Sequence, residues 1–260
     1  RNGIAEINIR LWEDKGVEER GGFYDGVGAL RDVGQNHLLQ MLALTAMARP
    51  RSFAAEDIRA ARQAFLASLV PLKPADIEKK TTRGQYEGYR GIKGVASDSE
   101  TETYFRVTAE SALPRWKGVR FNLESGKRLG RPLKEIEVVA RGQGPVKNTL
   151  TFHIEPKEGI TIRFLAKKPG RTLELEERKL GFDFRGTGRA RTAEDYEKLL
   201  WDCLTDDQTL FVSLFRSSGE IKAMWRFIDP IVAGWQKGLS PLLRYEPDSA
   251  AAFRPDTSSL

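Results

Sequence analysis

The clearest structural signal in this sequence is RGGFYDGVGALRDVGQNHLLQMLAL, residues 20–44. Glycines and acidic residues crowd its first half, whereas apolar residues at helical spacing fill its second half. This pattern predicts a glycine-rich turn region over residues 16–28 and then a helix over residues 34–48, which Pro50 ends. His37 opens the apolar run and is one of only two histidines in the chain.

Imidazole has the side-chain pKa nearest neutrality and is a common general base, so His37 is a candidate for proton transfer. A lone histidine beside an apolar stripe is more often a packed, hydrogen-bonded residue, and the two interpretations stay open at this point. The other histidine, His153, alternates with the apolar Leu150, Phe152 and Ile154. It therefore lies on the polar face of a predicted strand, where we expect a solvated role.

Outward from this stretch, the hydrophobic period changes between two and 3.6 residues. A second helix is predicted over residues 54–69, and further helices over residues 196–204 and 221–238. Strands are predicted over residues 2–13, 103–111, 119–124, 134–140, 148–154, 160–166 and 172–176. Short polar connections join several of these strands, which favours antiparallel pairing.

This order of elements predicts an α+β fold with a large, mostly antiparallel sheet and helices packed on one face. We expect one domain over residues 1–245. Residues 246–260 are rich in proline, serine, alanine and aspartate and are predicted to form a flexible tail.

Composition excludes several classes of protein. The chain has 260 residues, a net charge of +6 and a single cysteine, Cys203, for which we expect buried packing on an apolar helix. One cysteine rules out an internal disulfide framework and fits a reducing compartment such as the cytoplasm. No apolar run approaches the roughly 18 residues of a membrane span. Arg1 is not an initiator methionine and no signal segment follows it, so we expect a longer product.

The basic residues are interspersed with 36 acidic ones, so a nucleic-acid surface is not expected. The chain has one denser basic cluster, which is either a solvated face or a site for a phosphorylated ligand. Its members are Arg115, Lys117, Arg120, Lys127, Arg128, Arg131 and Lys134.

Motifs for a self-contained dinucleotide enzyme or metalloenzyme are missing from the sequence. No G-x-G-x-x-G follows a strand, and no G-x-x-x-x-G-K-[ST] or H-E-x-x-H occurs. A serine-nucleophile elbow, G-x-S-x-G, is also missing.

The stretch quoted above, together with residues just before it, resembles the substrate-site segment of glucose-6-phosphate dehydrogenases. The matching positions are Glu13, Gly16, Glu18, Arg20, Gly21, Asp25, Gly28, Arg31, Asp32, Gln35, Asn36, His37, Leu38, Leu39 and Gln40. Further landmarks are RGQY at 83–86, TET at 101–103, SGKRL at 125–129, NTLTFHIEPKEGI at 148–160, KKPG at 167–170 and DYEKLLWDCLTDD at 195–207. The resemblance extends to about Tyr245, and the family's amino-terminal coenzyme-binding half has no counterpart in this sequence.

The resemblance implies oxidation of glucose 6-phosphate to 6-phosphogluconolactone with NADP as hydride acceptor, the first step of the pentose phosphate pathway. It implies His37 as general base, and Glu13 and Asp32 as acceptors of sugar hydroxyls. Lys127 matches a lysine that contacts substrate. A second basic residue of the family falls on Pro132, and either Arg131 or Lys134 is expected to replace it.

The family also implies a cytoplasmic homo-oligomer, a dimer or tetramer, and the present chain alone is expected to be inactive. A second hypothesis is a non-catalytic regulatory or scaffold homologue of the same fold. In that case Glu13 is a solvated strand end, and Asp32 is a helix cap.

Local physics supports the role that the resemblance gives to His37. The macrodipole near a helix amino terminus disfavours imidazolium and keeps the ring ready to accept a proton. On one continuous α-helix, Asp32 and His37 would lie roughly 140° apart. We therefore expect Asp32 in the loop before the helix, facing the same cleft.

Overall fold

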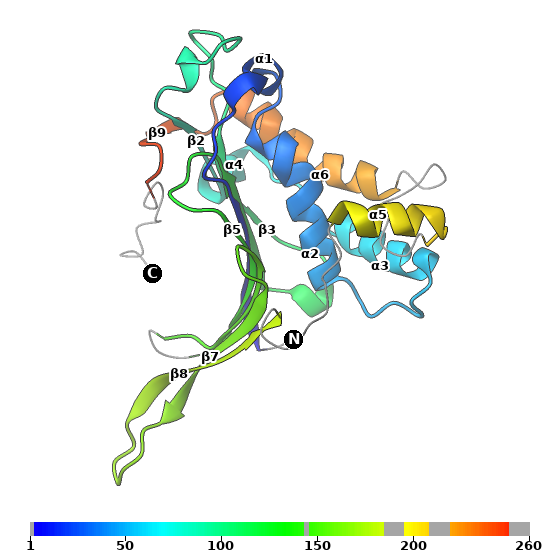
Figure 1. The fold of residues 1–260 in the computed structure, drawn as a ribbon, viewed down its shortest axis with the longest axis vertical. Coiled ribbons are helices and arrows are strands. Elements are labelled where there is room, and N and C mark those ends of the chain that lie inside the picture. Colours follow the sequence, from blue (N-terminus) through cyan, green and yellow to red (C-terminus); the bar gives the residue numbers. More distant parts are fainter. Residues whose placement is uncertain (1–2, 143–145, 185–194, 208–218, 250–260) are drawn as a thin grey trace.

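A computed structural model describes residues 3–142, 146–184, 195–207 and 219–249. Its centre is a nine-stranded sheet with the order β8-β7-β6-β5-β1-β4-β3-β2-β9. Helices lie against one side of one half of this sheet, and β7 and β8 extend beyond them (Figure 1). The strands are β1 (Ile4–Trp12), β2 (Thr81–Tyr86), β3 (Tyr104–Ala109), β4 (Arg120–Gly126), β5 (Leu133–Ala140), β6 (Thr149–Glu155), β7 (Gly159–Lys167), β8 (Leu175–Asp183) and β9 (Leu242–Tyr245).

Only β1 with β4 and β2 with β9 run parallel among the pairings of the described strands. All the other neighbours are antiparallel. The predicted α+β class, with a large and mostly antiparallel sheet, is therefore confirmed.

The helical elements connect and cover these strands. The longer ones are η2 (Leu30–Leu38), α2 (Leu39–Ala46), α3 (Ala55–Ala67), α5 (Asp195–Leu204) and α6 (Gly219–Gln236). The shorter ones are η1 (Glu18–Arg20), α1 (Gly21–Asp25), α4 (Pro74–Lys80), η3 (Tyr89–Gly91) and η4 (Pro114–Trp116). No helix of the described residues is both long and apolar enough to cross a membrane.

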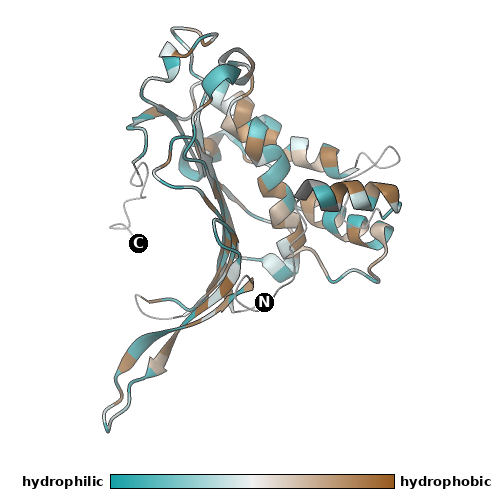
Figure 2. Cartoon of the chain, in the orientation of Figure 1, coloured by the Kyte–Doolittle hydropathy of each residue, from teal (hydrophilic) through white to brown (hydrophobic). Residues whose placement is uncertain are grey.

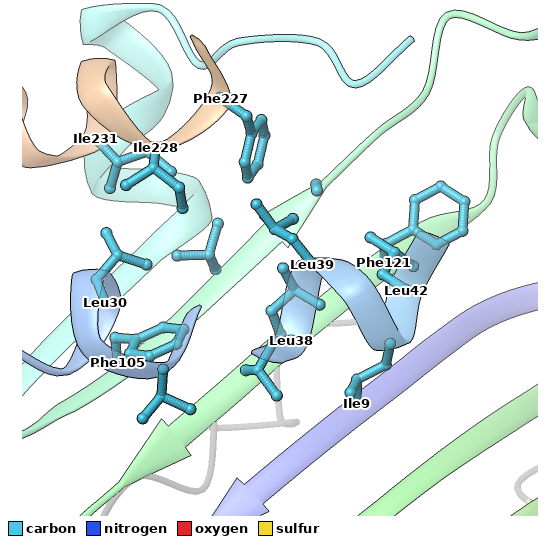
Figure 3. Packing of buried hydrophobic residues seen from close by; sticks show 14 of the residues in the cluster. Ile9, Leu30, Leu38, Leu39, Leu42, Phe105, Phe121, Phe227, Ile228 and Ile231 are labelled. Atoms are coloured by element: carbon cyan, nitrogen blue, oxygen red, sulfur yellow. The ribbon is translucent and has the colours of Figure 1, made fainter. Parts of the chain in front are cut away.

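The main core lies between the helices and the half of the sheet around β1, β4 and β3. Period-two alternation in β1 directs Ile7 and Ile9 towards the helices, and both are buried. Leu42 of α2 lies near the same strand with Phe121 beside it, and Leu39 lies towards Phe227 of α6 (Figure 3). Figure 2 shows that apolar and polar residues alternate along these helices.

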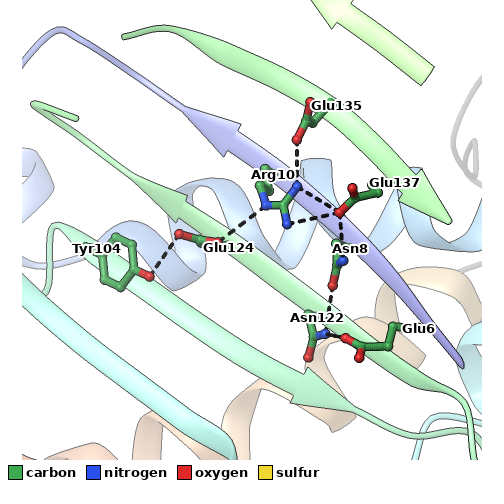
Figure 4. A network of polar contacts seen from close by, with 8 residues as sticks. All are labelled: Glu6, Asn8, Arg10, Tyr104, Asn122, Glu124, Glu135 and Glu137. Carbon is green, nitrogen blue, oxygen red and sulfur yellow. Dashed lines mark hydrogen bonds and ion pairs between the residues drawn. The ribbon is translucent and has the colours of Figure 1, made fainter. Parts of the chain in front are cut away.

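The opposite face of the sheet is polar, and Arg10 interacts there with residues of the neighbouring strands (Figure 4). The Arg10 guanidinium donates to Glu135 at 2.6 Å and to Glu137 at 3.2 Å, and lies 3.8 Å from Glu124. Tyr104 donates its hydroxyl to Glu124 at 3.0 Å. Four strands, β1, β3, β4 and β5, are thus joined by charged hydrogen bonds and an ion pair as well as by the backbone ladder.

Most predicted elements overlap observed ones, but α4, β2 and β9 are not anticipated by the sequence pattern. In β2 the polar Arg83 and Gln85 are buried, so the strand has no hydrophobic pattern from which it could be predicted. Arg83 Nε donates to the Ser240 carbonyl at 2.9 Å, and Gln85 Nε2 donates to the Thr101 carbonyl at 2.8 Å. The strand predicted at 172–176 starts only at Leu175 and continues to Asp183.

Two other expectations concern the end of the chain. The buried packing expected for Cys203 is wrong, because its side chain on α5 is exposed, as are those of Leu200 and Trp201. An apolar helix face becomes buried only where another element covers it. In the predicted tail, Asp248 pairs with Arg128 Nε at 2.9 Å, and residues 250–260 lie outside the described residues.

Candidate functional site

The helix that carries His37 begins earlier than predicted and has an unusual form. Residues 30–38 form the π-helix η2, and the Leu39 N–H donates to the carbonyl of Gly34, five residues earlier. A helix with i→i+5 hydrogen bonds has about 4.4 residues per turn, so residues five positions apart lie roughly 50° apart around its axis. Asp32 and His37 therefore lie on neighbouring parts of the η2 surface. The expectation that Asp32 precedes the helix is wrong, because Asp32 lies within η2 itself.

His37 is exposed and lies in the last turn of η2, which continues directly into α2. The argument from the amino-terminal macrodipole therefore fails, because the dipole effect falls off within the first turn. Asp32 is partly buried, and its carboxylate lies 3.6 Å from the Arg20 guanidinium. The imidazole is thus accessible, with a carboxylate on a neighbouring part of the helix surface.

Glu13 and Lys127 meet at the carboxyl ends of two parallel neighbours, β1 and β4. Glu13 N–H donates to the Gly126 carbonyl at 2.9 Å, which aligns the residues that follow the two strands. Lys127 is buried, and its ammonium donates to the Glu13 carboxylate. The structure brings these two predicted residues into direct contact although they are far apart in the sequence.

Tyr24 links this ion pair to η2. The Lys127 ammonium lies 5.4 Å from the centre of the Tyr24 ring, a cation–π contact. Tyr24 is fully buried, and its hydroxyl has no hydrogen-bond partner among the described residues. Burial raises the pKa of Tyr24 well above its usual value, and the negative charges of Glu102 and Asp32 add to this effect. Tyr24 therefore lies within electrostatic range of Asp32 on one side and touches Lys127 on the other.

The two candidates for the second basic residue point to different places. The Arg131 guanidinium lies 5.9 Å from the centre of the Trp12 ring, next to Glu13 in the chain. Lys134 donates to Glu155 on β6 at 2.6 Å. Only Arg131 is therefore directed towards the strand end that carries Glu13.

The remaining basic residues of the predicted cluster do not form one surface. Arg115 Nη2 donates to the Ala46 carbonyl at 3.1 Å, and Arg120 pairs with Glu6 at 2.7 Å. A half-open cavity of about 570 Å³ follows residues 110–120 and includes none of the candidate site residues. These arginines hold elements of the fold together.

Two residues near the candidate site were not singled out from the sequence. Tyr24 lies in α1, so the turn region predicted over residues 16–28 is wrong in part, because Glu18–Arg20 and Gly21–Asp25 form the short helices η1 and α1. Glu102 is the middle residue of the TET landmark. The TET landmark was the sequence signal that could have pointed to Glu102, because the position of this acidic residue is fixed by the threonines on both sides of it. His153 is remote from this group on β6, where its Nε2 lies 3.0 Å from the Thr161 hydroxyl.

Comparisons with known proteins identify the family of this chain. The family described as glucose-6-phosphate dehydrogenase, C-terminal domain, matches residues 1–256. Glucose-6-phosphate 1-dehydrogenase of Aggregatibacter actinomycetemcomitans is 39% identical over 249 residues, which cover 89% of this chain and 50% of the relative. Glucose-6-phosphate 1-dehydrogenase 2 of Mycobacterium bovis is 36% identical over 276 residues, which cover 98% and 52%.

A solved structure of a glucose-6-phosphate dehydrogenase in complex with its substrate glucose-6-phosphate has a TM-score of 0.86 to this fold. It is 28% identical, and the match covers 99% of this chain and 54% of that one. The chain thus spans about half the length of the relatives it matches. From the family match and these identities, the chain belongs to the glucose-6-phosphate dehydrogenase C-terminal domain family.

Proposed function

We propose that this chain is the substrate-binding part of an NADP-dependent glucose-6-phosphate dehydrogenase. The reaction oxidises D-glucose 6-phosphate to 6-phospho-D-glucono-1,5-lactone, the first step of the pentose phosphate pathway. The observation that carries the proposal is that Lys127 contacts both Glu13 and Tyr24, while Asp32, on the same helix as His37, acts electrostatically on Tyr24. The relatives named above carry the same activity in their names.

Lactone formation requires the C1 hydroxyl to lose its proton while a hydride leaves C1. His37 is the general base in this proposal, because it is exposed on η2 and imidazole accepts a proton near neutral pH. Glu13 and Asp32 accept hydrogen bonds from sugar hydroxyls, a task for which each carboxylate offers two acceptor oxygens. Lys127 donates to the substrate, and Arg131 rather than Lys134 supplies the second positive charge.

Glu13 and Lys127 bind each other. An ammonium has three donors and a carboxylate two acceptor oxygens, so both groups can also bond to substrate. Because Lys127 is buried and charged, its ammonium needs an anionic or polar partner at every stage. The pairing with Glu13 keeps both groups in place before substrate arrives.

The described residues do not fit NADP. The glycines that follow β1 lack the G-x-G-x-x-G spacing with which a turn between a strand and a helix holds a dinucleotide pyrophosphate. We therefore assign no residue of this chain to the coenzyme and no step to it. For the same reason, this chain by itself is expected not to turn over.

Self-association is the second part of the proposal. The apolar side of the sheet continues past the helices through two rows of registered partners. These rows are Ile9, Ile136, Phe152, Ile160 and Phe182, and Ile7, Val138, Leu150, Ile162 and Leu180. Burial falls along each row, from 1% exposure at Ile7 to 61% at Leu180. A second copy of the chain would cover this face, and a dimer is the simplest symmetric assembly.

The test of the proposed chemistry is His37→Asn in the complete protein, with His153→Asn as the matched control. Asparagine keeps much of the shape but cannot accept the proton. We expect the turnover number with glucose 6-phosphate to fall about 10²- to 10⁴-fold while the Michaelis constant changes little. The control should behave as the wild type. If His37→Asn keeps near wild-type turnover, His37 is not the base. If the wild type neither binds nor oxidises glucose 6-phosphate, the chain belongs to a non-catalytic homologue.

The cellular location is also part of this proposal. We place the enzyme in the cytoplasm, because the single cysteine, Cys203, is unpaired and exposed, which suits a reducing compartment.

A further inference from the structure

Glu102 contacts the first residues of η2. It accepts two backbone hydrogen bonds from consecutive residues at this end of the helix. Its carbonyl accepts the Ala29 N–H at 3.0 Å, and its carboxylate Oε1 accepts the Leu30 N–H at 3.0 Å. Helix amino termini leave such N–H groups without intrahelical partners, so Glu102 satisfies groups that would otherwise be buried and unpaired.

The backbone around this contact is shaped to let the carboxylate in. Gly28 adopts a φ of +77°, and a Cβ at this position would lie 2.4 Å from Oε1 of Glu102 and 2.6 Å from Oε2. Any larger residue would displace the carboxylate. The close approach of the two residues therefore depends on glycine for both conformation and space.

Backbone groups and the helix end hold the negative charge of Glu102. Arg31 directs its guanidinium to the carbonyls of Val27 and Gly26, and Arg83 Nε donates to the Ser240 carbonyl. Both arginines attract the carboxylate from a distance, but burial dominates and raises the pKa of Glu102 to about 7. The other titratable groups that face it are the hydroxyls of Tyr24 and Tyr89.

We propose that Glu102 is a positioning residue for the oxidation reaction, acting through η2 to hold Asp32 and His37 on neighbouring parts of the helix surface. The inference rests on the function proposed above. It follows from the two helical forms available to residues 30–38. In the π-form, Asp32 and His37 lie roughly 50° apart around the helix axis, whereas in the α-form they lie roughly 140° apart.

Because π-helices are rare, an anchor at the start of the helix is needed to keep this form. The two hydrogen bonds to Glu102 fix where the helix begins and which way its first turn faces. Loss of the carboxylate removes the Leu30 contact. The segment is then free to rewind into the α-form, which turns Asp32 away from His37.

The experiment compares Glu102→Ala, Glu102→Gln and Glu100→Ala in the complete protein. Glutamine keeps an acceptor oxygen for the Leu30 N–H, whereas alanine does not. Glu100 is the matched control, because it lies two residues away with its side chain 72% exposed, against 9% for Glu102. The first readout is a crystal structure of each variant, which shows whether the Leu39 N–H still bonds to Gly34 or moves to Gln35.

The second readout is kcat/KM with glucose 6-phosphate. We expect Glu102→Ala to shift the hydrogen bond to Gln35 and to lower kcat/KM about 10²-fold, the scale of loss for a misplaced catalytic group. Glu102→Gln should keep the π-form and lose less than about fivefold, and Glu100→Ala should match the wild type. If Glu102→Ala does not fold, the test rests on Glu102→Gln, which still has an acceptor oxygen for the Leu30 N–H. A Leu39 hydrogen bond shifted to Gln35 in that variant, or a loss of kcat/KM as large as 10²-fold, overturns the proposal.

An unchanged π-form in Glu102→Ala overturns the anchoring whatever the activity. Equal kcat/KM in Glu102→Ala and Glu100→Ala overturns the positioning role. Absence of glucose 6-phosphate oxidation in the wild type instead refutes the proposed function. The proposed function is thus tested by the activity of the wild type, whereas the role of Glu102 is tested by the crystal structures and kinetics of the variants, so the two failures are distinguishable.

Discussion

The buried ion pair between α3 and α6 offers a sharp test of what holds the helical layer together. Arg62 Nε donates to Glu220 Oε1 at 2.8 Å, and Nη2 donates to Oε2 at 3.3 Å, which is the two-pronged geometry of a strong pair. The residues are only 3% and 2% exposed. The perturbation is Glu220→Ala, which removes the carboxylate that faces the guanidinium.

The magnitude follows from burial. Breaking a buried pair by removing one partner costs about 3–5 kcal/mol, since the guanidinium loses two hydrogen bonds and an opposite charge in a low-dielectric site. For a chain of this size, each kcal/mol lowers the melting temperature by about 2–4 °C. We therefore expect Glu220→Ala to melt about 10 °C below the wild type. Replacing both residues by apolar ones, as in Arg62→Met with Glu220→Leu, should recover most of this loss.

The matched control is Glu155→Ala. Glu155 pairs with Lys134 at 2.6 Å, but the two side chains are 50% and 35% exposed. An exposed pair contributes at most about 1 kcal/mol. The assay is thermal unfolding of the 260-residue chain at one fixed concentration, followed by circular dichroism. Equal losses in Glu220→Ala and Glu155→Ala would refute the reasoning, as would a double variant no more stable than Glu220→Ala alone.

Three further predictions test the site, the titration of Glu102 and the assembly. Lys127→Ala in the complete protein should raise the Michaelis constant for glucose 6-phosphate about tenfold or more, whereas Lys134→Ala should leave it unchanged. The pKa of Glu102 is about 7 in the folded chain against 4.5 ordinarily, so the folded state binds the extra proton between these values. Stability should therefore fall, by on the order of 3 kcal/mol, as pH rises from 4.5 to 7, and urea titrations of Glu102→Gln should lack this slope. Light scattering should report about twice the chain mass for the wild type and for Lys179→Asp, but a monomer for Phe182→Asp; a monomeric wild type would contradict the assembly proposal.

Hydrophobic period and turn residues were sufficient to predict most of the architecture. The alternation in residues 2–13 and the 3.6-residue spacing after His37 are local properties of the chain, and the corresponding strand and helix form where predicted. The hydrophobic pattern failed to predict a strand whose buried side chains are polar. Strand β2 carries Arg83 and Gln85 inside, because backbone carbonyls from distant residues satisfy them.

The candidate residues were also named from the sequence, but the reasons for their arrangement were partly wrong. Asp32 is inside the helix, and His37 is far from the amino-terminal dipole. A π-helical turn cannot be predicted from spacing, because the same residues fit an α-helix equally well. In our proposal, the π-form is selected by Glu102, which accepts the Leu30 N–H. Glu102 is distant in the sequence, so the residues of η2 alone do not indicate this contact.

By itself, the sequence determined the fold class, the identity of the acidic and basic residues available for chemistry, and the family to which the motif belongs. These depend on residue type and short spacing, which are properties of the chain before it folds. Only the tertiary structure decided that Lys127 meets Glu13 over Tyr24, that Arg131 rather than Lys134 points to that strand end, and that α5 leaves Cys203 exposed. Each of these depends on which strand ends and helices become neighbours, and parallel pairing of β1 with β4 joins residues whose separation in the sequence gives no sign of the contact.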